Sequence, residues 1–255
     1  MTNFIHQNAK IGNQTTIGYF SFIDDDVIIG DNCTIANNVT IYAGTRIGNN
    51  CTIFPNAVIG AVPQDLKFNG EYSTVEIHDH VTIRECATIN RGTSASGKTV
   101  VGSHSLIMAY VHIAHDCMIG KHCILANSTN LAGHVTIDDY AYFGGMSGAH
   151  QFTHIGKHAF ISGGSMIGKD VPPYITVMRN PAQYAGINVV GLKRQQFDVN
   201  SIHQIQDIYR LLFGSGLNTS QALEKIEQDI PSSIYKTEIV QFVNEASRGI
   251  IKGII

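Results

Sequence analysis

Residues 5–59 decide the fold, and they read IHQNAK IGNQTT IGYFSF IDDDVI IGDNCT IANNVT IYAGTR IGNNCT IFPNAV I, with isoleucine at the start of every six-residue block. The same step of six resumes at Ile77 and continues in register to Ile167. Of the 28 grid positions between residues 5 and 167, 24 are Ile, Leu, Val or Phe; the exceptions are Asp65, Glu71, Ala95 and Ala149. A period of six matches neither an amphipathic helix nor an alternating strand. It predicts a solenoid with short flat sides.

A second, smaller position recurs within each block. Four residues after the large side chain comes a small one, as in Ala9, Cys33 and Thr45, and glycine often follows the large residue directly. This alternation resembles the hexapeptide-repeat family, in which three blocks form one triangular coil of eighteen residues. The resemblance implies left-handed coiling, with successive coils stacked at about 4.8 Å. We therefore expect an all-β solenoid, a left-handed parallel β-helix of hexapeptide repeats, followed by a small C-terminal α-helical domain.

The pattern lapses at two places while the register afterwards is kept. Residues 60–76 and 90–100 are therefore predicted to be loop excursions from the coil, and long loops on rigid scaffolds often carry function. After Asp170 the segment VPPYITVMRNPAQ contains three prolines, which end regular coiling. We predict two domains, the β-helix over residues 1–187 and the helical domain over residues 188–255.

Three polar residues mark where helices of the second domain should begin. Asp198 is a candidate N-cap for a helix through about Phe213, and Asn218 for a second through about Asp229. Ser232 or Ser233 should start a third helix, which ends near Arg248.

Composition excludes a few classes of protein. The formal charge of −3 gives no global attraction to nucleic acid or acidic membranes. The N-terminus has no basic segment followed by an apolar run, and no later run is long enough to span a bilayer, so we expect a cytoplasmic protein without stable membrane insertion. The five cysteines include no paired CxxC motifs, which argues against disulfides and structural zinc.

The histidines are concentrated in one region. Seven of the twelve lie within residues 112–158. Division by eighteen leaves remainders of 7, 8 and 6 for His115, His134 and His150, so three successive coils should place them near one corner as a vertical stack. His112 lies three residues before His115 on the same coil, whereas the remainders of His122, His154 and His158 direct them elsewhere. Histidine has an unperturbed pKa suited to general-base work at neutral pH.

Several longer stretches stand out beside the repeat: AVPQDLKFNGE (61–71), INRGT (89–93), HIAHDC (112–117), ILANSTNLAGHVTIDD (124–139), GGMSGAHQF (144–152), DVPPY (170–174) and GLKR (191–194). Together they are similar to the UDP-N-acetylglucosamine 3-O-acyltransferase family of hexapeptide-repeat transferases. The resemblance implies transfer of a 3-hydroxyacyl chain from acyl carrier protein to the 3-hydroxyl of UDP-N-acetylglucosamine, the first step of lipid A synthesis. It also implies a homotrimer with active sites between subunits, and we expect neither a cofactor nor a metal.

The resemblance assigns roles to individual residues. His115 matches the general base, Asp116 a residue that orients it, and the backbone N–H of Gly133 the oxyanion donor. Gly133 lies eighteen residues beyond His115 and so one coil above it. The matching substrate-binding residues are Asp65, Lys67, His112, His134, His150, Gln151, Asn188 and Arg194.

Specificity and docking also follow from the resemblance. Gly163 matches the acyl-chain ruler, where glycine leaves room for a donor of about fourteen carbons or more. Val190 and Gln195 depart from the family pattern, in which an acid and a second arginine are usual. Because acyl carrier protein is acidic, candidates for its docking surface are Lys169, Arg179, Lys193, Arg194, Arg210, Lys236 and Arg248.

Three other readings stay open on the residues alone. The N-acyltransferase of the same pathway carries an extra N-terminal domain, whereas the repeats here begin at residue 5. A trimeric hexapeptide-type carbonic anhydrase would bind zinc through histidines, with His112, His115 and His134 as possible ligands. A non-catalytic scaffold is the third alternative.

Overall fold

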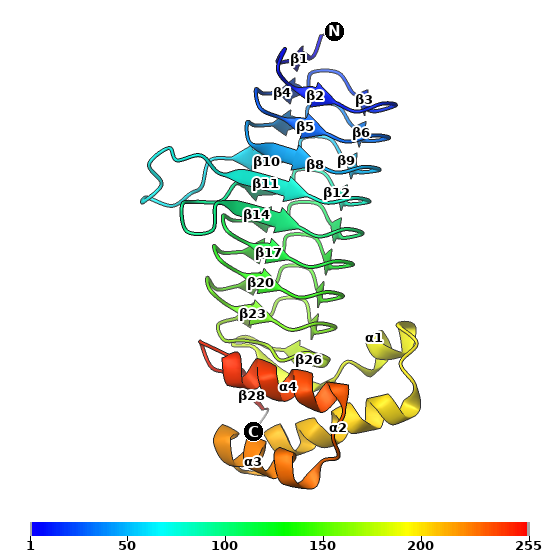
Figure 1. The fold of residues 1–255 in the computed structure, drawn as a ribbon, viewed down its shortest axis with the longest axis vertical. Coiled ribbons are helices and arrows are strands. Elements are labelled where there is room, and N and C mark those ends of the chain that lie inside the picture. The colour runs from blue at the N-terminus through cyan, green and yellow to red at the C-terminus, as the bar shows by residue number, and fades with distance from the viewer. Residues whose placement is uncertain (1, 254–255) are drawn as a thin grey trace.

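The computed structural model describes residues 2–253 and shows a tall triangular coil that ends on a cluster of helices (Figure 1). Within these residues the strands form three parallel sheets, one on each face of the prism, apart from one antiparallel pair near the end of the coil. Each coil contributes one short strand to each face, and neighbouring strands come from successive coils. The predicted left-handed parallel β-helix is confirmed.

The strands are listed here by face. The first face holds β1 (Phe4–Ile5), β4 (Phe22–Ile23), β7 (Thr40–Ile41), β10 (Val58–Ala61), β13 (Thr88–Asn90), β16 (His112–Ile113), β19 (Asn130–Leu131), β22 (Gly148–Ala149) and β25 (Met166–Ile167). The second holds β2 (Lys10–Ile11), β5 (Ile28–Ile29), β8 (Thr45–Ile47), β11 (Thr74–Ile77), β14 (Lys98–Val101), β17 (Met118–Ile119), β20 (Thr136–Ile137) and β23 (His154–Ile155). The third holds β3 (Thr16–Ile17), β6 (Thr34–Ile35), β9 (Thr52–Ile53), β12 (Thr82–Ile83), β15 (Leu106–Ile107), β18 (Ile124–Leu125), β21 (Tyr142–Phe143), β24 (Phe160–Ile161), β26 (Ile175–Met178), β27 (Gln183–Ile187) and β28 (Lys252–Gly253).

The large residue of each block points into the prism and stacks on its equivalent in the next coil. On the first face Ile23, Ile41, Ile59, Ile89 and Ile113 pair in succession, and all are fully buried. The small position completes the core, and Cys33, Cys51, Cys117 and Cys123 are buried there. A fully buried Ile contributes roughly 1.5–3 kcal/mol, so the repeated pattern accounts for much of the stabilisation of the coil.

The excursions leave the coil where the pattern lapses, at residues 62–73 and 91–97, and they protrude together from one side (Figure 1). They are narrower than the predicted 60–76 and 90–100, because β10, β11, β13 and β14 extend beyond the grid residues. The first excursion adds twelve residues between the stacked Ile59 and Ile89, and the second adds six between Ile89 and Ile113. Both additions are multiples of six, so the six-residue register is kept after each excursion. Asp65, Glu71 and Ala95 fall in these loops, whereas Ala149 remains buried in β22.

The C-terminal part of the described chain forms the helices α1 (Val189–Arg194), α2 (Val199–Gly214), α3 (Thr219–Asp229) and α4 (Ile234–Glu245). Asp198, Asn218 and Ser233 accept backbone hydrogen bonds at the starts of α2, α3 and α4, which confirms these three as N-caps.

Two details of these helices differ from the prediction. Helix α4 ends at Glu245 rather than near Arg248, and α1 was not predicted because it is shorter than two turns. The division into domains at residues 187 and 188 stays a prediction, and its outer ends, residue 1 and residues 254–255, lie outside the described residues. Among residues 2–253, no helix combines the length and the apolar character needed to cross a membrane.

Candidate functional site

Both excursions leave the prism at the corner between the first and second faces, and the chemistry of the site gathers at this corner. In the next coil the corner between β16 and β17 carries His115 and Asp116. One coil further on, the same corner carries Gly133 and His134. Asp116 and His134 occupy equivalent left-handed turn positions, with φ of 59° and 60°. Eighteen-residue stacking therefore brings the catalytic candidates together, as their spacing predicts.

The carboxylate of Asp116 is buried and saturated with hydrogen bonds. Its side chain has no exposed surface. Oδ1 accepts the backbone N–H of Thr93 at 3.0 Å and of Ser96 at 3.3 Å, and it also accepts the Ser96 hydroxyl. Oδ2 accepts the Thr93 hydroxyl at 2.7 Å and meets His115 Nδ1 at 2.7 Å.

These contacts keep Asp116 ionised. Burial by itself would raise the pKa of this carboxyl, but the hydrogen bonds from Ser96, His115 and Thr93 outweigh burial and lower the pKa to about 2. An ionised carboxylate can only accept hydrogen bonds. The Nδ1 atom of His115 must therefore carry the proton, which leaves Nε2 of the neutral imidazole free to accept one.

The His115 ring lies against the backbone of Gly133 in the next coil. A Cβ atom at position 133 would come within 2.5 Å of Cε1 and 2.6 Å of Nε2 of His115, so only glycine allows this approach. The N–H of Gly133 donates to no group of residues 2–253. The free Nε2 and an unpartnered backbone donor thus lie side by side.

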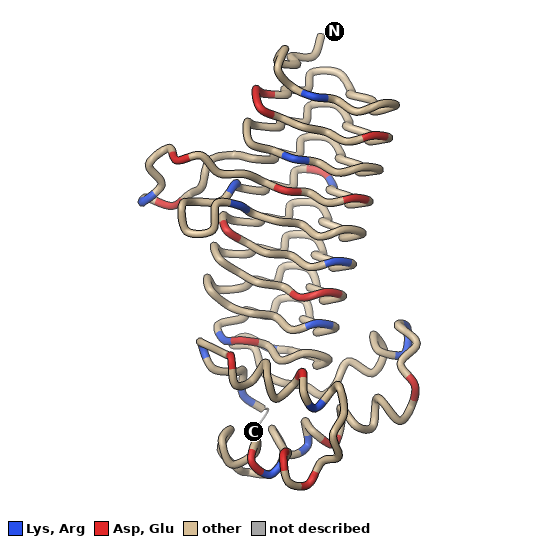
Figure 2. Tube along the Cα trace, viewed as in Figure 1, with Lys and Arg blue, Asp and Glu red and all other residues tan. Residues whose placement is uncertain are grey.

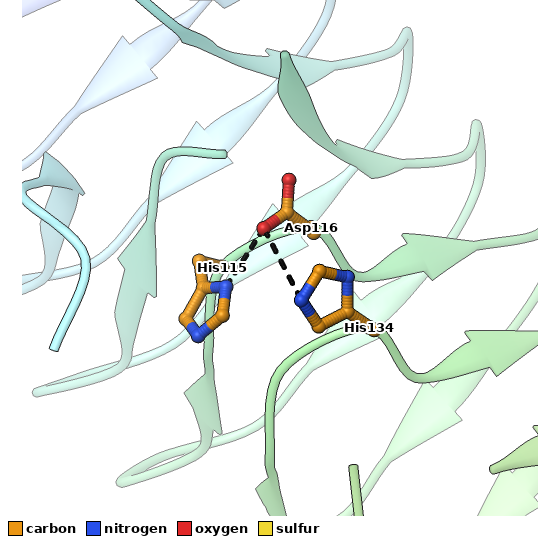
Figure 3. Close-up of side chains that lie close together, drawn as sticks. All are labelled: His115, Asp116 and His134. Atoms are coloured by element: carbon orange, nitrogen blue, oxygen red, sulfur yellow. Dashed lines mark hydrogen bonds and ion pairs between the residues drawn. The ribbon is translucent and has the colours of Figure 1, made fainter. Parts of the chain in front are cut away.

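His134 is the third member of the cluster drawn in Figure 3. Its Nε2 lies 3.7 Å from Asp116 Oδ2, and its ring meets the His115 ring edge-on, with centroids 5.1 Å apart. The ring instead stacks on Phe152, one coil further on, at 4.4 Å. The three histidines therefore share a corner but do not form the expected vertical stack.

A hollow of about 630 Å³ opens beside His115 over the first face, and Gly133, His112 and His150 also line it. His112 Nδ1 lies 2.8 Å from the Thr88 hydroxyl. Burial, and then the nearby His115, lower the pKa of His112, which favours the neutral ring.

His150 and Gln64 line this hollow, whereas Gln151, which follows His150 in the chain, does not. The exposed His150 ring contacts the Gln151 carbonyl through Nδ1, and Gln151 itself is exposed. Gln64 lines the hollow although its neighbour Asp65, rather than Gln64, was predicted to bind substrate. Spacing could not find Gln64, because it lies in a loop that lacks the repeat.

Asp65 and Lys67 lie in the first excursion. Lys67 is exposed and Asp65 is half-buried, and Asp65 Oδ1 accepts the Lys67 N–H at 2.9 Å. Leu66 between them is fully exposed. Neither predicted residue lines the hollow beside His115 in this single chain.

Asn188 and Arg194 line a second hollow, of about 570 Å³, against the third face. The Asn188 amide is occupied: Oδ1 accepts the Gly191 N–H at 3.0 Å, and Nδ2 donates to the His158 carbonyl at 2.9 Å. It caps α1 and fastens that helix to the coil. Val190 and Gln195, the departures from the family pattern, line the same hollow.

Gly163 lies on the corner between the third and first faces, in the turn from β24 to β25. It is exposed, and a Cβ there would lie 3.1 Å from the Gly145 carbonyl oxygen. A side chain therefore fits after a small shift. Met166 and Gly148 on the same face line the His115 hollow, but Gly163 does not.

Lys and Arg are mixed with Asp and Glu along the coil and over the helices (Figure 2). Lys236 is unsuited to docking, because its buried ammonium donates to the carbonyls of Glu227 and Ile230 and pairs with the Glu227 carboxylate at 2.7 Å. The sequence could not show this, since the partners come from the end of α3.

One group within residues 2–253 has a geometry that could hold a metal ion. Ligand atoms of His115, Asp116 and His134 lie within 4.8 Å of one another. This set contains two of the three histidines considered for zinc, with Asp116 in place of His112. A metal there would have to displace the hydrogen bond between Asp116 and His115.

Comparison with known proteins places this geometry in a family. A model described as UDP N-acetylglucosamine O-acyltransferase, domain 2, matches residues 170–251. Models of hexapeptide repeats match residues 8–43, 98–133 and 27–61. A relative from Xylella fastidiosa, named acyl-(acyl-carrier-protein)–UDP-N-acetylglucosamine O-acyltransferase, is 43% identical over 77% of this chain and 75% of its own. The chain belongs to the UDP-N-acetylglucosamine O-acyltransferase family.

Solved structures of UDP-N-acetylglucosamine acyltransferases agree. That from Bacteroides fragilis is 49% identical, with a TM-score of 0.96 over 98% of both chains. That from Francisella novicida is 41% identical, with a TM-score of 0.95 over 98% of this chain and 92% of its own. The predicted resemblance and the acyltransferase class are confirmed. Membership of the UDP-N-acetylglucosamine O-acyltransferase family does not favour the carbonic anhydrase or N-acyltransferase alternatives.

Proposed function

We propose that this enzyme transfers a 3-hydroxyacyl chain from acyl carrier protein to the 3-hydroxyl of UDP-N-acetylglucosamine, with His115 as the general base and the Gly133 N–H as the oxyanion donor. One observation carries the assignment. Asp116 holds the protonated Nδ1 of His115, while the His115 ring lies directly against Gly133, whose own N–H is free.

The reaction needs a base because a sugar hydroxyl is a poor nucleophile at neutral pH. Nε2 of His115 takes the hydroxyl proton as the oxygen attacks the thioester carbonyl. The C–O bond forms, and the carbonyl electrons move to oxygen to give a tetrahedral oxyanion. The oxyanion then collapses, the C–S bond breaks, and the imidazolium returns its proton to the departing thiolate of the carrier.

Two features stabilise charge along this path. Asp116 is ionised and 2.7 Å from His115 Nδ1, so it stabilises the imidazolium that forms. The Gly133 N–H supplies a hydrogen bond to the oxyanion, and losing such a donor typically costs a factor of about 10²–10³ in rate.

Substrate binding is assigned to residues around this centre. We propose that the sugar lies in the hollow with His112, His134, His150 and Gln151, where the neutral His112 can accept or donate a hydrogen bond. Asn188 and Arg194 are proposed to lie near the nucleotide and the donor. For Asn188 this contact is proposed through its place beside Arg194 in the second hollow, since its amide is already hydrogen-bonded.

We further propose a homotrimer in which the excursion at residues 62–73 closes the site of a neighbouring subunit. Asp65 and Lys67 do not line the hollow of their own chain, and they belong to an excursion, residues 62–73, that protrudes from the prism (Figure 1). The cytoplasmic location stays a prediction.

The test is an incubation of the purified protein with UDP-N-acetylglucosamine and 3-hydroxyacyl carrier proteins of several chain lengths. We expect one product whose mass equals the sugar nucleotide plus the acyl group, ester-linked at the 3-oxygen. An amide-linked product, or acylation of another hydroxyl, would contradict the proposal.

A further inference from the structure

We propose that Thr93 and Ser96, in the excursion at residues 91–97, are positioning residues that fix the Asp116 carboxylate so that Oδ2 faces His115 rather than His134. This inference rests on the proposed function, because it assumes that His115 is the base.

The excursion encloses the carboxylate with donors. Thr93 and Ser96 together provide two backbone N–H groups and two hydroxyls to Asp116. Three of these donors meet Oδ1, and only the Thr93 hydroxyl shares Oδ2 with His115. The rotation of the carboxylate about its Cβ–Cγ bond is therefore set by the loop.

A second histidine competes for the same oxygen. His134 Nε2 lies 3.7 Å from Oδ2, beyond a hydrogen bond, while His115 Nδ1 lies at 2.7 Å. A modest movement of the carboxylate toward His134 would release His115. Nε2 and Nδ1 of His115 would then compete for the proton, and the fraction of molecules with a free Nε2 would fall.

The excursion at residues 91–97 is itself held in place by hydrogen bonds, so it can fix the orientation of the Asp116 carboxylate. The Gly97 N–H donates to the Thr93 carbonyl at 2.8 Å, which closes the loop on itself. The Glu71 carboxylate accepts the Asn69 N–H at 2.8 Å and the Ser94 N–H at 3.0 Å. Glu71 thereby joins this loop to the excursion that carries Asp65 and Lys67.

The decisive experiment is a double-mutant cycle between the loop and Asp116. Thr93→Val combined with Ser96→Ala removes both hydroxyl donors but leaves both backbone N–H groups. Because a misplacement of about 1 Å in a catalytic site can cost about a hundredfold in rate, we expect kcat to fall at least about tenfold with little change in the KM for UDP-N-acetylglucosamine. In an Asp116→Ala background the same pair should lower kcat by less than about twofold further, because the loop acts through Asp116.

Rescue by a conservative variant separates positioning from general support of the fold. Thr93→Ser keeps the hydroxyl donor to Asp116 Oδ2 and should keep kcat close to that of wild type, whereas Thr93→Val removes that donor and should lower kcat. Ser94→Ala, in the same loop with no contact to Asp116, is the matched control and should behave as wild type.

The outcomes are distinct. If the losses from the loop pair and from Asp116→Ala multiply, or if the loop pair keeps wild-type kcat while Asp116→Ala is impaired, the inference is wrong. If the loop pair unfolds, the same cycle is run with Thr93→Val alone. A fully active Asp116→Ala would also overturn the inference, whereas a wild-type protein that transfers no acyl chain would overturn the proposed function itself.

Discussion

The proposed mechanism requires that Asp116 is ionised, because its carboxylate holds and stabilises His115. Its pKa of about 2 lies below the usual value near 3.8, so the folded protein favours the ionised form. The stability that this group contributes is fully present above pH about 4 and is lost as the pH falls through 4 toward 2. The shift corresponds to about 2 kcal/mol.

We therefore expect the free energy of unfolding of Asp116→Asn to depend less on pH than that of wild type. The difference in the free energy of unfolding between wild type and Asp116→Asn should narrow as the pH is lowered from 5 to 3. Denaturant unfolding at matched protein concentration measures it. A gap that stays constant over this range would show that Asp116 has an ordinary pKa in the folded protein.

Gly133 gives a second test at the residue scale. A Cβ at this position would lie 2.5 Å from His115 Cε1, so Gly133→Ala should push the ring away while the backbone N–H stays. We expect kcat to fall about a hundredfold or more, the scale for losing a positioned base, with the melting temperature nearly unchanged. Gly214→Ala serves as a control for inserting a Cβ in free space, because the nearest atom there, Arg210 Cγ, would lie 3.9 Å away. Wild-type kcat in Gly133→Ala would rule out the close approach.

How much the sequence predicts differs among these residues. The eighteen-residue separation of His115 and Gly133 predicts that they stack, because the period continues through both. The partners of Asp116 could not be found in this way. Thr93 and Ser96 lie in a segment without the period, and their contacts depend on how the loop folds back.

Among the elements, the corner between the second and third faces carries a column of aromatic rings that the sequence did not predict. His80, His104, His122, Tyr140 and His158 stack at 4.7–4.8 Å, and His158 continues to Tyr174 at 5.7 Å. His122 and His158 are 36 residues apart, which is two coils of eighteen, so their spacing places them at one corner.

His158 makes this column sensitive to acid. Burial, and then Lys157, lower the pKa of His158 to about 4, against opposing effects of Glu238 and Asp139. In the unfolded chain the His158 ring therefore takes up a proton near pH 6.5, whereas in the folded chain it stays neutral until the pH falls toward 4. The stability associated with the neutral ring is present above pH 6.5 and lost as the pH falls toward 4, by about 2–3 kcal/mol.

His158→Phe keeps a stacked ring but cannot take up a proton. We expect its free energy of unfolding to fall less than that of wild type between pH 6.5 and 4, as measured by denaturant unfolding. Equal slopes for the two proteins would contradict the lowered pKa. His203→Phe is the matched control, since His203 is exposed on α2.

For the whole molecule, the sequence predicts the prism well because one short rule repeats along it. In the C-terminal part, the sequence predicts where α2, α3 and α4 begin, because each begins at a polar N-cap residue. The role of the excursions does not follow from the sequence, because in the proposed trimer it depends on contact with a neighbouring chain. The proposed trimer is what would give Asp65 and Lys67 a substrate to bind.

We propose that the side chain at position 163 limits the length of the acyl donor. Gly163→Met adds a side chain at a corner where backbone geometry permits one. We propose that it removes room for about four CH₂ groups. At about 0.8 kcal/mol each this shifts preference by roughly 3 kcal/mol, or a hundredfold, toward donors near ten carbons. Competition among carrier proteins loaded with ten-, twelve-, fourteen- and sixteen-carbon chains measures it, and an unchanged order would remove Gly163 from the ruler.

The most direct test of the central claim is the turnover of His115→Ala with its natural substrate pair. The account predicts an intact fold and oligomeric state, nearly unchanged binding of UDP-N-acetylglucosamine, and 3-O-acyl product formed about two to four orders of magnitude more slowly than by wild type. A loss of less than about tenfold would contradict it, because His115 could not then be the base that takes the sugar proton.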